Sequence, residues 1–170
     1  MKKLTTLLLA LALIPSLVFA QTRSISEFQD KYREMDNTTF VDISGSLFNF
    51  ASNIAKYVDE DDEDKEDIEA ASRILGAIKA MQVLKVPFDL LDRNDISSLE
   101  KNMKREKYEQ LMSIKEHDSN INILAQGSGA ELENVTFLID SDDDFVLFTF
   151  QGMFSMSDVS YLVKNKQNWD

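Results

Sequence analysis

Two apolar runs near the C-terminus constrain the fold of this 170-residue chain more than any other feature. The first run, VTFLID from residue 135, places alternate side chains on opposite sides, which is the periodicity of a β-strand. The second run, FVLFTF from residue 145, is apolar on both faces, as in a strand that lies mid-sheet or is covered on both sides. Residues 141–144, SDDD, favour a turn between them, because Asp bonds its own backbone and tolerates tight bends. The stretch predicts the central hairpin of a small sheet.

The residues after this hairpin predict a closing helix. Gly152 is expected to break the second strand, and SMSD at residues 155–158 fits a capping box with Ser155 as the N-cap. The helix would carry its apolar residues on one face and pack back over the hairpin; these residues are Val159, Leu162 and Val163.

The rest of the chain alternates between helical and extended patterns. In chain order we expect a helix over 24–35, a strand over 38–43, helices through 47–58 and over 66–75, a strand over 77–86, a helix over 92–107 and strands over 109–116 and 120–126. The second of these helices is marked by a stripe of apolar residues, namely Leu47, Phe50, Ala51, Ile54 and Val58. Runs of strands after helices predict an α+β fold, with a mostly antiparallel sheet of about five to six strands and helices packed on one face.

Residues 1–20 have the composition of a cleavable signal peptide. Lys2 and Lys3 form a basic start, residues 4–14 an apolar core and residues 18–20 a cleavage site of the small-residue type. A membrane anchor is the alternative, but the apolar run is shorter than a span and Pro15 interrupts it. The sequence has no cysteine for a lipid anchor, a thiolate metal site or a disulfide. We therefore expect a single exported domain over 21–170 that is periplasmic or secreted and free of a membrane anchor.

The charge of the chain is strongly acidic, with 30 Asp and Glu against 18 Lys and Arg and a net charge of −12. Such a surface repels phosphate backbones and anionic lipids, so we expect no nucleic-acid partner. A basic protein partner and cation binding both remain compatible with it. The densest acidic run, DEDDEDKED over 59–67, is expected to be a solvated loop.

The acidic turn of the hairpin supplies the candidate metal ligands, Asp140, Asp142 and Asp144. An EF-hand that started at Asp140 would need Gly at its sixth position and Glu at its twelfth, where this chain has Phe145 and Gln151. The residues therefore fit an irregular site for a hard cation or, as the favoured interpretation, an acidic hairpin turn.

Catalytic patterns are missing from the sequence. His117 is the only histidine, and it stands between two acids at a predicted turn, where a surface position is the favoured interpretation and a triad the alternative. No Ser lies in a G-x-S-x-G elbow, and GSG at 127–129 lacks the rest of a phosphate loop. A phenylalanine-rich stretch lines either a ligand groove or, more commonly, the core; it comprises Phe145, Phe148, Phe150 and Phe154. We expect no catalytic residue and no cofactor.

The mature part of the chain resembles the bacterial domain of unknown function 4252 family. The resemblance rests on FQDKYREMDNTTFVDISGSLFNFAS, IKAMQVLKV, KYEQLMSIKEHDSNINILAQ and FVLFTFQGMFSMSDVSYL, which cover most of residues 24–163. It implies a small exported α+β domain with no assigned activity and no catalytic or ligand residues to transfer. It also implies genes near those of extracytoplasmic-function sigma factors and their membrane regulators, which points to envelope signalling.

These observations favour a non-enzymatic protein of the bacterial cell envelope that binds another protein or has a regulatory role. A sheet edge over residues 38–43 is one place where a partner strand could add. An envelope protein that binds a small ligand or a divalent cation is the alternative, and a hydrolase ranks third.

Overall fold

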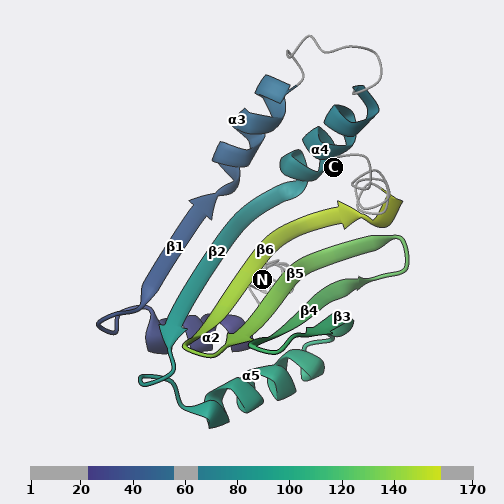
Figure 1. Ribbon diagram of the computed structural model, residues 1–170. Helices are drawn as coiled ribbons and strands as arrows, with labels where there is room; N and C mark the ends of the chain where they lie inside the picture. The colour runs from purple at the N-terminus through teal and green to yellow at the C-terminus, as the bar shows by residue number, and fades with distance from the viewer. Residues whose placement is uncertain (1–22, 56–64, 158–170) are drawn as a thin grey trace, which may run out of the picture.

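The computed structural model describes residues 23–55 and 65–157, which form one antiparallel sheet and four helices (Figure 1). The strands lie in the order β1-β2-β6-β5-β4-β3. Their bounds are β1 Thr39–Ser44, β2 Ile78–Pro87, β3 Glu109–Lys115, β4 Ser119–Ser128, β5 Glu131–Ser141 and β6 Asp144–Ser155. The predicted α+β class is therefore confirmed. The hairpin of β5 and β6 occupies the two central positions of the sheet, as its apolar runs indicated.

The helices are α2 Arg23–Tyr32, α3 Gly45–Ala55, α4 Lys65–Ala77 and α5 Arg93–Arg105. The order of these ten elements along the chain agrees with the expected order. Of the helix predicted after β6, the described part includes the N-cap residue Ser155. The Ser155 hydroxyl accepts a hydrogen bond from the Ser157 N–H at 3.2 Å. The apolar residues expected for that helix, Val159 to Val163, lie outside the described residues, as do residues 59–64 of the acidic run.

The core lies between one face of the sheet and helices α2 and α5. In the centre of that face Leu84, Leu147 and Leu138 stand side by side on β2, β6 and β5, and all three are buried. From α2, Phe28 packs edge-on against Phe145 of β6 with ring centroids 5.6 Å apart. Three neighbouring strands and one helix thus contribute to the same layer, and burial of apolar side chains is the dominant favourable contribution to folding.

Two glycines do not have the roles expected from the sequence. Gly152 does not end the second strand, because β6 continues through it to Ser155. A Cβ at Gly152 would lie 2.3 Å from the carbonyl oxygen of Ala77, so the glycine permits the end of α4 to approach β6 closely. The helix expected over 66–75, with Gly76 as the residue that ends it, continues to Ala77, so Gly76 lies inside α4.

Helices α3 and α4 form a pair that extends beyond one end of the sheet (Figure 1). Small polar residues hold the pair together. Ser52 donates a hydrogen bond to the Ser72 carbonyl oxygen at 2.8 Å, and Ser72 donates one to the Ser52 carbonyl oxygen at 3.0 Å. Both serines are buried, so α3 contacts α4 through the side that carries Ser52, while Leu47, Phe50 and Ile54 are exposed.

The two edges of the sheet are β1 and β3. Every residue of β3 is exposed, and its register with β4 shifts between Gln110 and Met112, so that Leu111 is an additional residue in the edge strand. Within residues 23–55 and 65–157, no helix combines the length and the apolar content that crossing a bilayer requires.

Candidate functional site

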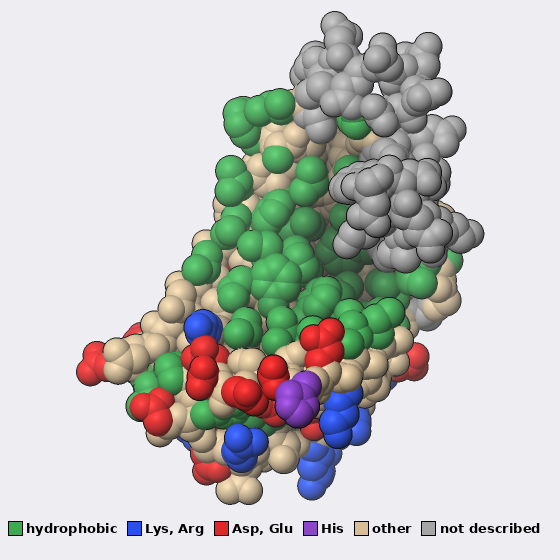
Figure 2. Space-filling view, viewed as in Figure 1, with side chains coloured by type: hydrophobic (Ala, Val, Ile, Leu, Met, Phe, Trp, Pro, Cys, Tyr) green, Lys and Arg blue, Asp and Glu red, His purple; other side chains and the backbone are tan. Residues whose placement is uncertain are grey.

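The second face of the sheet is apolar, and none of the four described helices contributes a core residue to it. Its side chains alternate with those of the core along the central strands β2, β6 and β5. One residue from each of the six strands forms a continuous row across it, in the order Val41, Val83, Phe148, Phe137, Ile123 and Met112. We call this surface the apolar face. Figure 2 shows apolar side chains over the part of this face that is in view.

Two further rows complete the apolar face. On the side towards α3 the register aligns Ile43, Met81, Phe150 and Val135; on the other side it aligns Val146, Ile139, Ile121 and Ile114. At the two edges of the sheet the exposed fraction is 41% for Val41 and 52% for Met112. A contiguous apolar area that crosses a whole sheet is typical of an interaction site and not of scattered surface residues.

Three phenylalanines form the centre of the apolar face. Phe148 and Phe150 lie on β6 with ring centroids 4.6 Å apart, and Phe137 of β5 lies 5.7 Å from Phe148 and 6.2 Å from Phe150. All three pairs have the edge-to-face arrangement that aromatic rings prefer. The rings support one another, so the face has a rigid aromatic centre and more accessible aliphatic residues at its edges.

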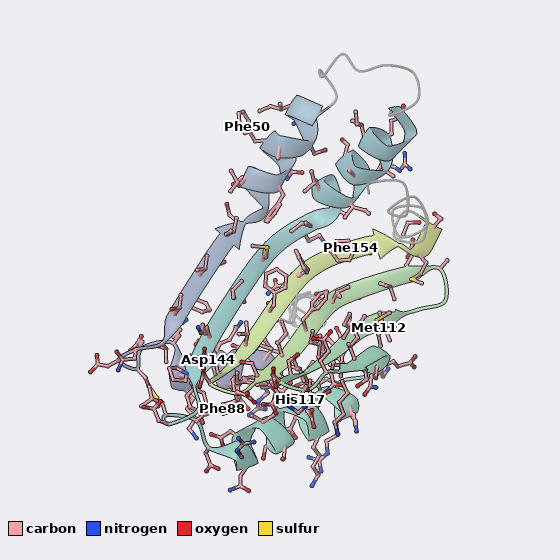
Figure 3. The ribbon with its side chains drawn as sticks, in the orientation of Figure 1. Phe50, Phe88, Met112, His117, Asp144 and Phe154 are labelled. Carbon is pink, nitrogen blue, oxygen red and sulfur yellow. The ribbon has the colours of Figure 1, made fainter. Side chains whose placement is uncertain are left out.

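Helix α3 carries a second apolar surface. Leu47, Phe50 and Ile54, spaced by three and four residues, share one side of the helix and have exposed fractions of 56%, 63% and 49%. Of the five residues of the stripe that identified this helix in the sequence, these three are exposed, Ala51 is half-buried and Val58 lies outside the described residues. We call the three exposed residues the stripe on α3. Phe50 points away from α4 (Figure 3), and Figure 2 shows the apolar side chains of the sheet continuing towards α3 on the same side of the molecule.

An acidic rim borders the apolar face at the end opposite to α3. It is formed by exposed acids from three connections: Asp89 after β2, Glu116 and Asp118 between β3 and β4, and Asp142 and Asp143 between β5 and β6. In Figure 2 acidic side chains follow the edge of the apolar area there. Because these carboxylates border one end of a low-polarity surface, they favour a cationic group at this end of anything bound to the face.

The candidate metal ligands are separated by the local structure of the hairpin. Asp140 is half-buried near the end of β5, Asp142 is exposed in the turn, and the Asp144 carboxylate forms a salt bridge with Lys85 at 2.7 Å. The Asp144 carbonyl oxygen also accepts a hydrogen bond from Ser141 at 2.8 Å. Among the described residues, no group of three or more His, Cys, Asp or Glu side chains is arranged to hold a metal ion.

His117 lies in the turn between β3 and β4, at the same end as Asp144 (Figure 3). Its side chain is 99% exposed, and the nearest acidic oxygen, Oδ1 of Asp118, lies 3.8 Å from Nε2. A catalytic histidine is normally positioned by a hydrogen bond and shielded from bulk water. The surroundings of His117 in the described structure provide neither.

A polar cluster joins α2 to α5 on the covered side of the sheet. The Asp95 carboxylate accepts hydrogen bonds from Lys31 and from the buried Tyr32 hydroxyl, which in turn accepts the N–H of Asp92 at 3.2 Å. These two hydrogen bonds hold the pKa of Asp95 below its usual value, and the bond from Lys31 has the larger effect. Burial raises the pKa of the Tyr32 hydroxyl most strongly, and the hydrogen bond to Asp95 raises it further. The cluster fixes one helix to the other.

A second polar contact fixes the start of α2. The Glu106 carboxylate accepts the N–H of Ser24 at 2.9 Å and its hydroxyl at 2.6 Å. The sequence SISE at residues 24–27 fits a capping box and thus predicts Ser24 as the N-cap with Glu27 as its partner. Instead, Ser24 lies inside α2 and Glu27 pairs with Arg23. A residue 82 positions away thus satisfies an N–H group that the first turn of a helix leaves unpaired.

Comparison with known proteins adds the family. Residues 32–162 match a family described as a domain of unknown function (DUF4252). The chain belongs to the DUF4252 family. This confirms the resemblance seen in the sequence. No curated protein and no solved structure matches the chain. The DUF4252 match contains all six strands and hence the whole apolar face, whereas α2 enters it only at Tyr32.

The sequence predicted the strands of the apolar face in this DUF4252 chain but not its accessibility. Of the four phenylalanines assigned to a groove or a core, Phe145 and Phe154 are buried, whereas Phe148 and Phe150 lie on the apolar face. A signal was present in the sequence. Both faces of β6 are apolar, whereas the two helices that contribute to the core cluster, α2 and α5, cover one face of the sheet.

Proposed function

We propose that this DUF4252 protein is a non-enzymatic binding module of the bacterial cell envelope, and that its apolar face receives an amphipathic helix of another envelope protein. The observation that carries the proposal is the row of six apolar residues, one from each strand, which no described helix covers. A sheet normally buries an apolar face against a helix or a second sheet, as α2 and α5 do on the opposite side. The leader-like residues 1–20 support the placement in the envelope.

The shape of the apolar face favours a helix over a small molecule. Small-molecule sites are concave and enclose most of their ligand. The apolar face instead extends over six strands, with Val41 and Met112 accessible at its two edges. An open surface of that extent suits a helix that lays its own apolar side on it.

The charges around the face specify the partner further. The acidic rim lies at the end of the apolar face opposite to α3, and the chain as a whole has a net charge of −12. A helix with Lys or Arg near one end would bring opposite charges together when its apolar side is seated, and this would fix its direction on the sheet. The same charge disfavours a surface of anionic lipid.

The proposal is tested by photocrosslinking in the bacterial envelope. A benzoylphenylalanine is introduced at Met112 or at Val41, at opposite edges of the apolar face, and the control carries it at the exposed Lys104 of α5. Met112 and Val41 are expected to crosslink to one envelope protein, within a peptide that has apolar residues at helical spacing and basic residues near one end. Position 104 should give no such product.

Three outcomes would refute the proposal: no product from Met112 and Val41, equal labelling from Lys104, or crosslinks solely to other copies of this chain. A further variant, Val83→Lys, places a charge in the centre of the apolar face and should abolish the crosslink from both edges. Its circular-dichroism melt, recorded beside that of the parent protein, separates loss of binding from loss of folding.

A further inference from the structure

Helix α3 has the properties that the apolar face would select in a binding partner. We propose that a second copy of this chain docks on the apolar face through α3, so that each copy of a two-fold dimer places Leu47, Phe50 and Ile54 on the sheet of the other. The inference rests on the proposed function, because it takes the apolar face to be a surface that receives a helix. It differs in the source of that helix, which is this protein itself.

The first argument is that both surfaces belong to one chain and lie on one side of it. The stripe on α3 is at least 49% exposed at each of its three positions, and α3 extends beyond one end of the sheet (Figure 1). A two-fold axis between α3 and the sheet would bring α3 of each copy over the sheet of the other. The same two patches then meet twice, as a closed two-fold interface requires.

The second argument is charge. The sequence of α3, GSLFNFASNIA, contains no charged residue, whereas α2, α4 and α5 each contain both acids and bases. Two copies of a chain with a net charge of −12 repel each other over most of their surfaces. Of the four described helices, α3 is thus the one that can approach another copy without carrying acidic side chains into the interface.

The third argument is size. An 11-residue helix is about 16 Å long at the usual rise of 1.5 Å per residue. Six strands spaced by about 4.8 Å give the sheet a width of about 24 Å between its edge strands. Helix α3 therefore fits within the apolar face. Because the two-fold arrangement makes this contact twice, each dimer buries both stripes and both sheets, which moves it towards the interface area of stable dimers.

The test uses the absence of cysteine from the chain. Two single variants of the mature protein, Phe50→Cys and Val83→Cys, are mixed and treated with a short bis-maleimide, so that every link between positions 50 and 83 joins two copies. The control mixture combines Phe50→Cys with Lys104→Cys, where position 104 is exposed on α5, away from the apolar face. The linked 50–83 species is expected in at least about tenfold excess over the linked 50–104 species, the ratio that 1.4 kcal/mol of preference gives.

Sedimentation equilibrium supplies the second readout. The parent protein should be a dimer whose dissociation constant rises at least about tenfold in Phe50→Asp, because loss of a central aromatic contact costs that much or more. Asn53→Asp adds the same charge to an exposed position of α3 beside the stripe and should leave the dissociation constant within about twofold. A monomeric parent protein, equal effects of the two variants, or equal yields in the two crosslinking mixtures would overturn the proposal.

Salt separates this inference from the proposed function. Self-association of two acidic copies is expected to strengthen as salt screens their repulsion, whereas binding of a basic helix at the acidic rim should weaken. If the 50–83 link fails while the Met112 and Val41 photocrosslinks to an envelope protein succeed, the dimer is wrong and the proposed function stands. If the 50–83 link succeeds and the Met112 and Val41 photocrosslinks join only copies of this chain, the dimer stands and the proposed binding of another envelope protein is wrong.

Discussion

The contact between Asp95 and Tyr32 gives a sharp test of how α2 is held on the sheet. Replacing Asp95 with Ala removes the acceptor of the buried Tyr32 hydroxyl and the partner of Lys31. A hydrogen bond to a charged group contributes about 1.5–3 kcal/mol, and a buried donor left unpaired costs about 1–3 kcal/mol. We therefore expect Asp95→Ala to lower the free energy of unfolding by about 2 kcal/mol. In a domain of this size that corresponds to a fall in Tm of about 4–8 °C.

A double-mutant cycle isolates the contribution of the hydroxyl. In the Tyr32→Phe background no buried hydroxyl is left without a hydrogen-bond partner. Asp95→Ala should therefore lower the free energy of unfolding by about 1–2 kcal/mol less than it does in the parent protein. Urea unfolding followed by circular dichroism gives the free energy of unfolding of all four proteins. Asp95→Ala also removes the Lys31 contact and the charge near the start of α5, but it does so in both backgrounds, so these losses cancel in the cycle. Equal costs of Asp95→Ala in the two backgrounds would refute the reasoning.

The effect of Asp95 also depends on pH in a definite direction. Its pKa is lower in the folded protein than in the unfolded chain, where it is about 3.9. The contribution of Asp95 to the free energy of unfolding is therefore complete above about pH 3.9, the pKa of the unfolded chain. It is lost as the pH falls through the lower pKa of the folded protein. The difference in stability between the parent protein and Asp95→Ala should be constant from pH 7 to pH 5 and should narrow below about pH 4. A difference that grows on acidification would contradict the assignment.

Two further substitutions test the remaining contacts. Glu106→Ala removes the acceptor of the Ser24 N–H and hydroxyl and should lower the free energy of unfolding in urea by about 1–2 kcal/mol. The same change at the exposed Glu109 should have an effect below about 0.5 kcal/mol. Gly152→Ala forces a Cβ against the Ala77 carbonyl oxygen, 2.3 Å away, and should cost about 1–3 kcal/mol in the same assay. A cost below 0.5 kcal/mol at position 152 would mean that α4 moves freely on β6.

Local chemistry explains what the sequence predicted well. The Asp92 side chain accepts the Asn94 N–H at 2.9 Å, which is why the start of α5 agrees with the expected boundary. The apolar runs of β5 and β6 and the acidic turn between them likewise depend on neighbours in the chain. For this reason the order of the ten described elements and the central hairpin were both correct.

The differences arise where distant segments meet. Ser24 is bound by Glu106, and Gly152 makes room for Ala77; neither partner is visible in the local pattern. The same reason applies to the candidate site. Periodicity assigns Phe148 and Phe150 to one side of a strand, but whether a helix covers that side depends on how the helices are distributed over the fold. The sequence thus located the residues of the apolar face without indicating that it is accessible.

The additional residue in edge strand β3 has a consequence for how this protein behaves at high concentration. A sheet with an accessible apolar face and a regular edge would be a template for strand-by-strand growth into fibrils. Leu111 interrupts the register of β3, and Glu109 and Lys115 place charges at the two ends of that edge. A further strand could not continue the ladder along it without a matching irregularity. The β3 edge therefore resists extension by a further strand, although it borders an exposed apolar surface.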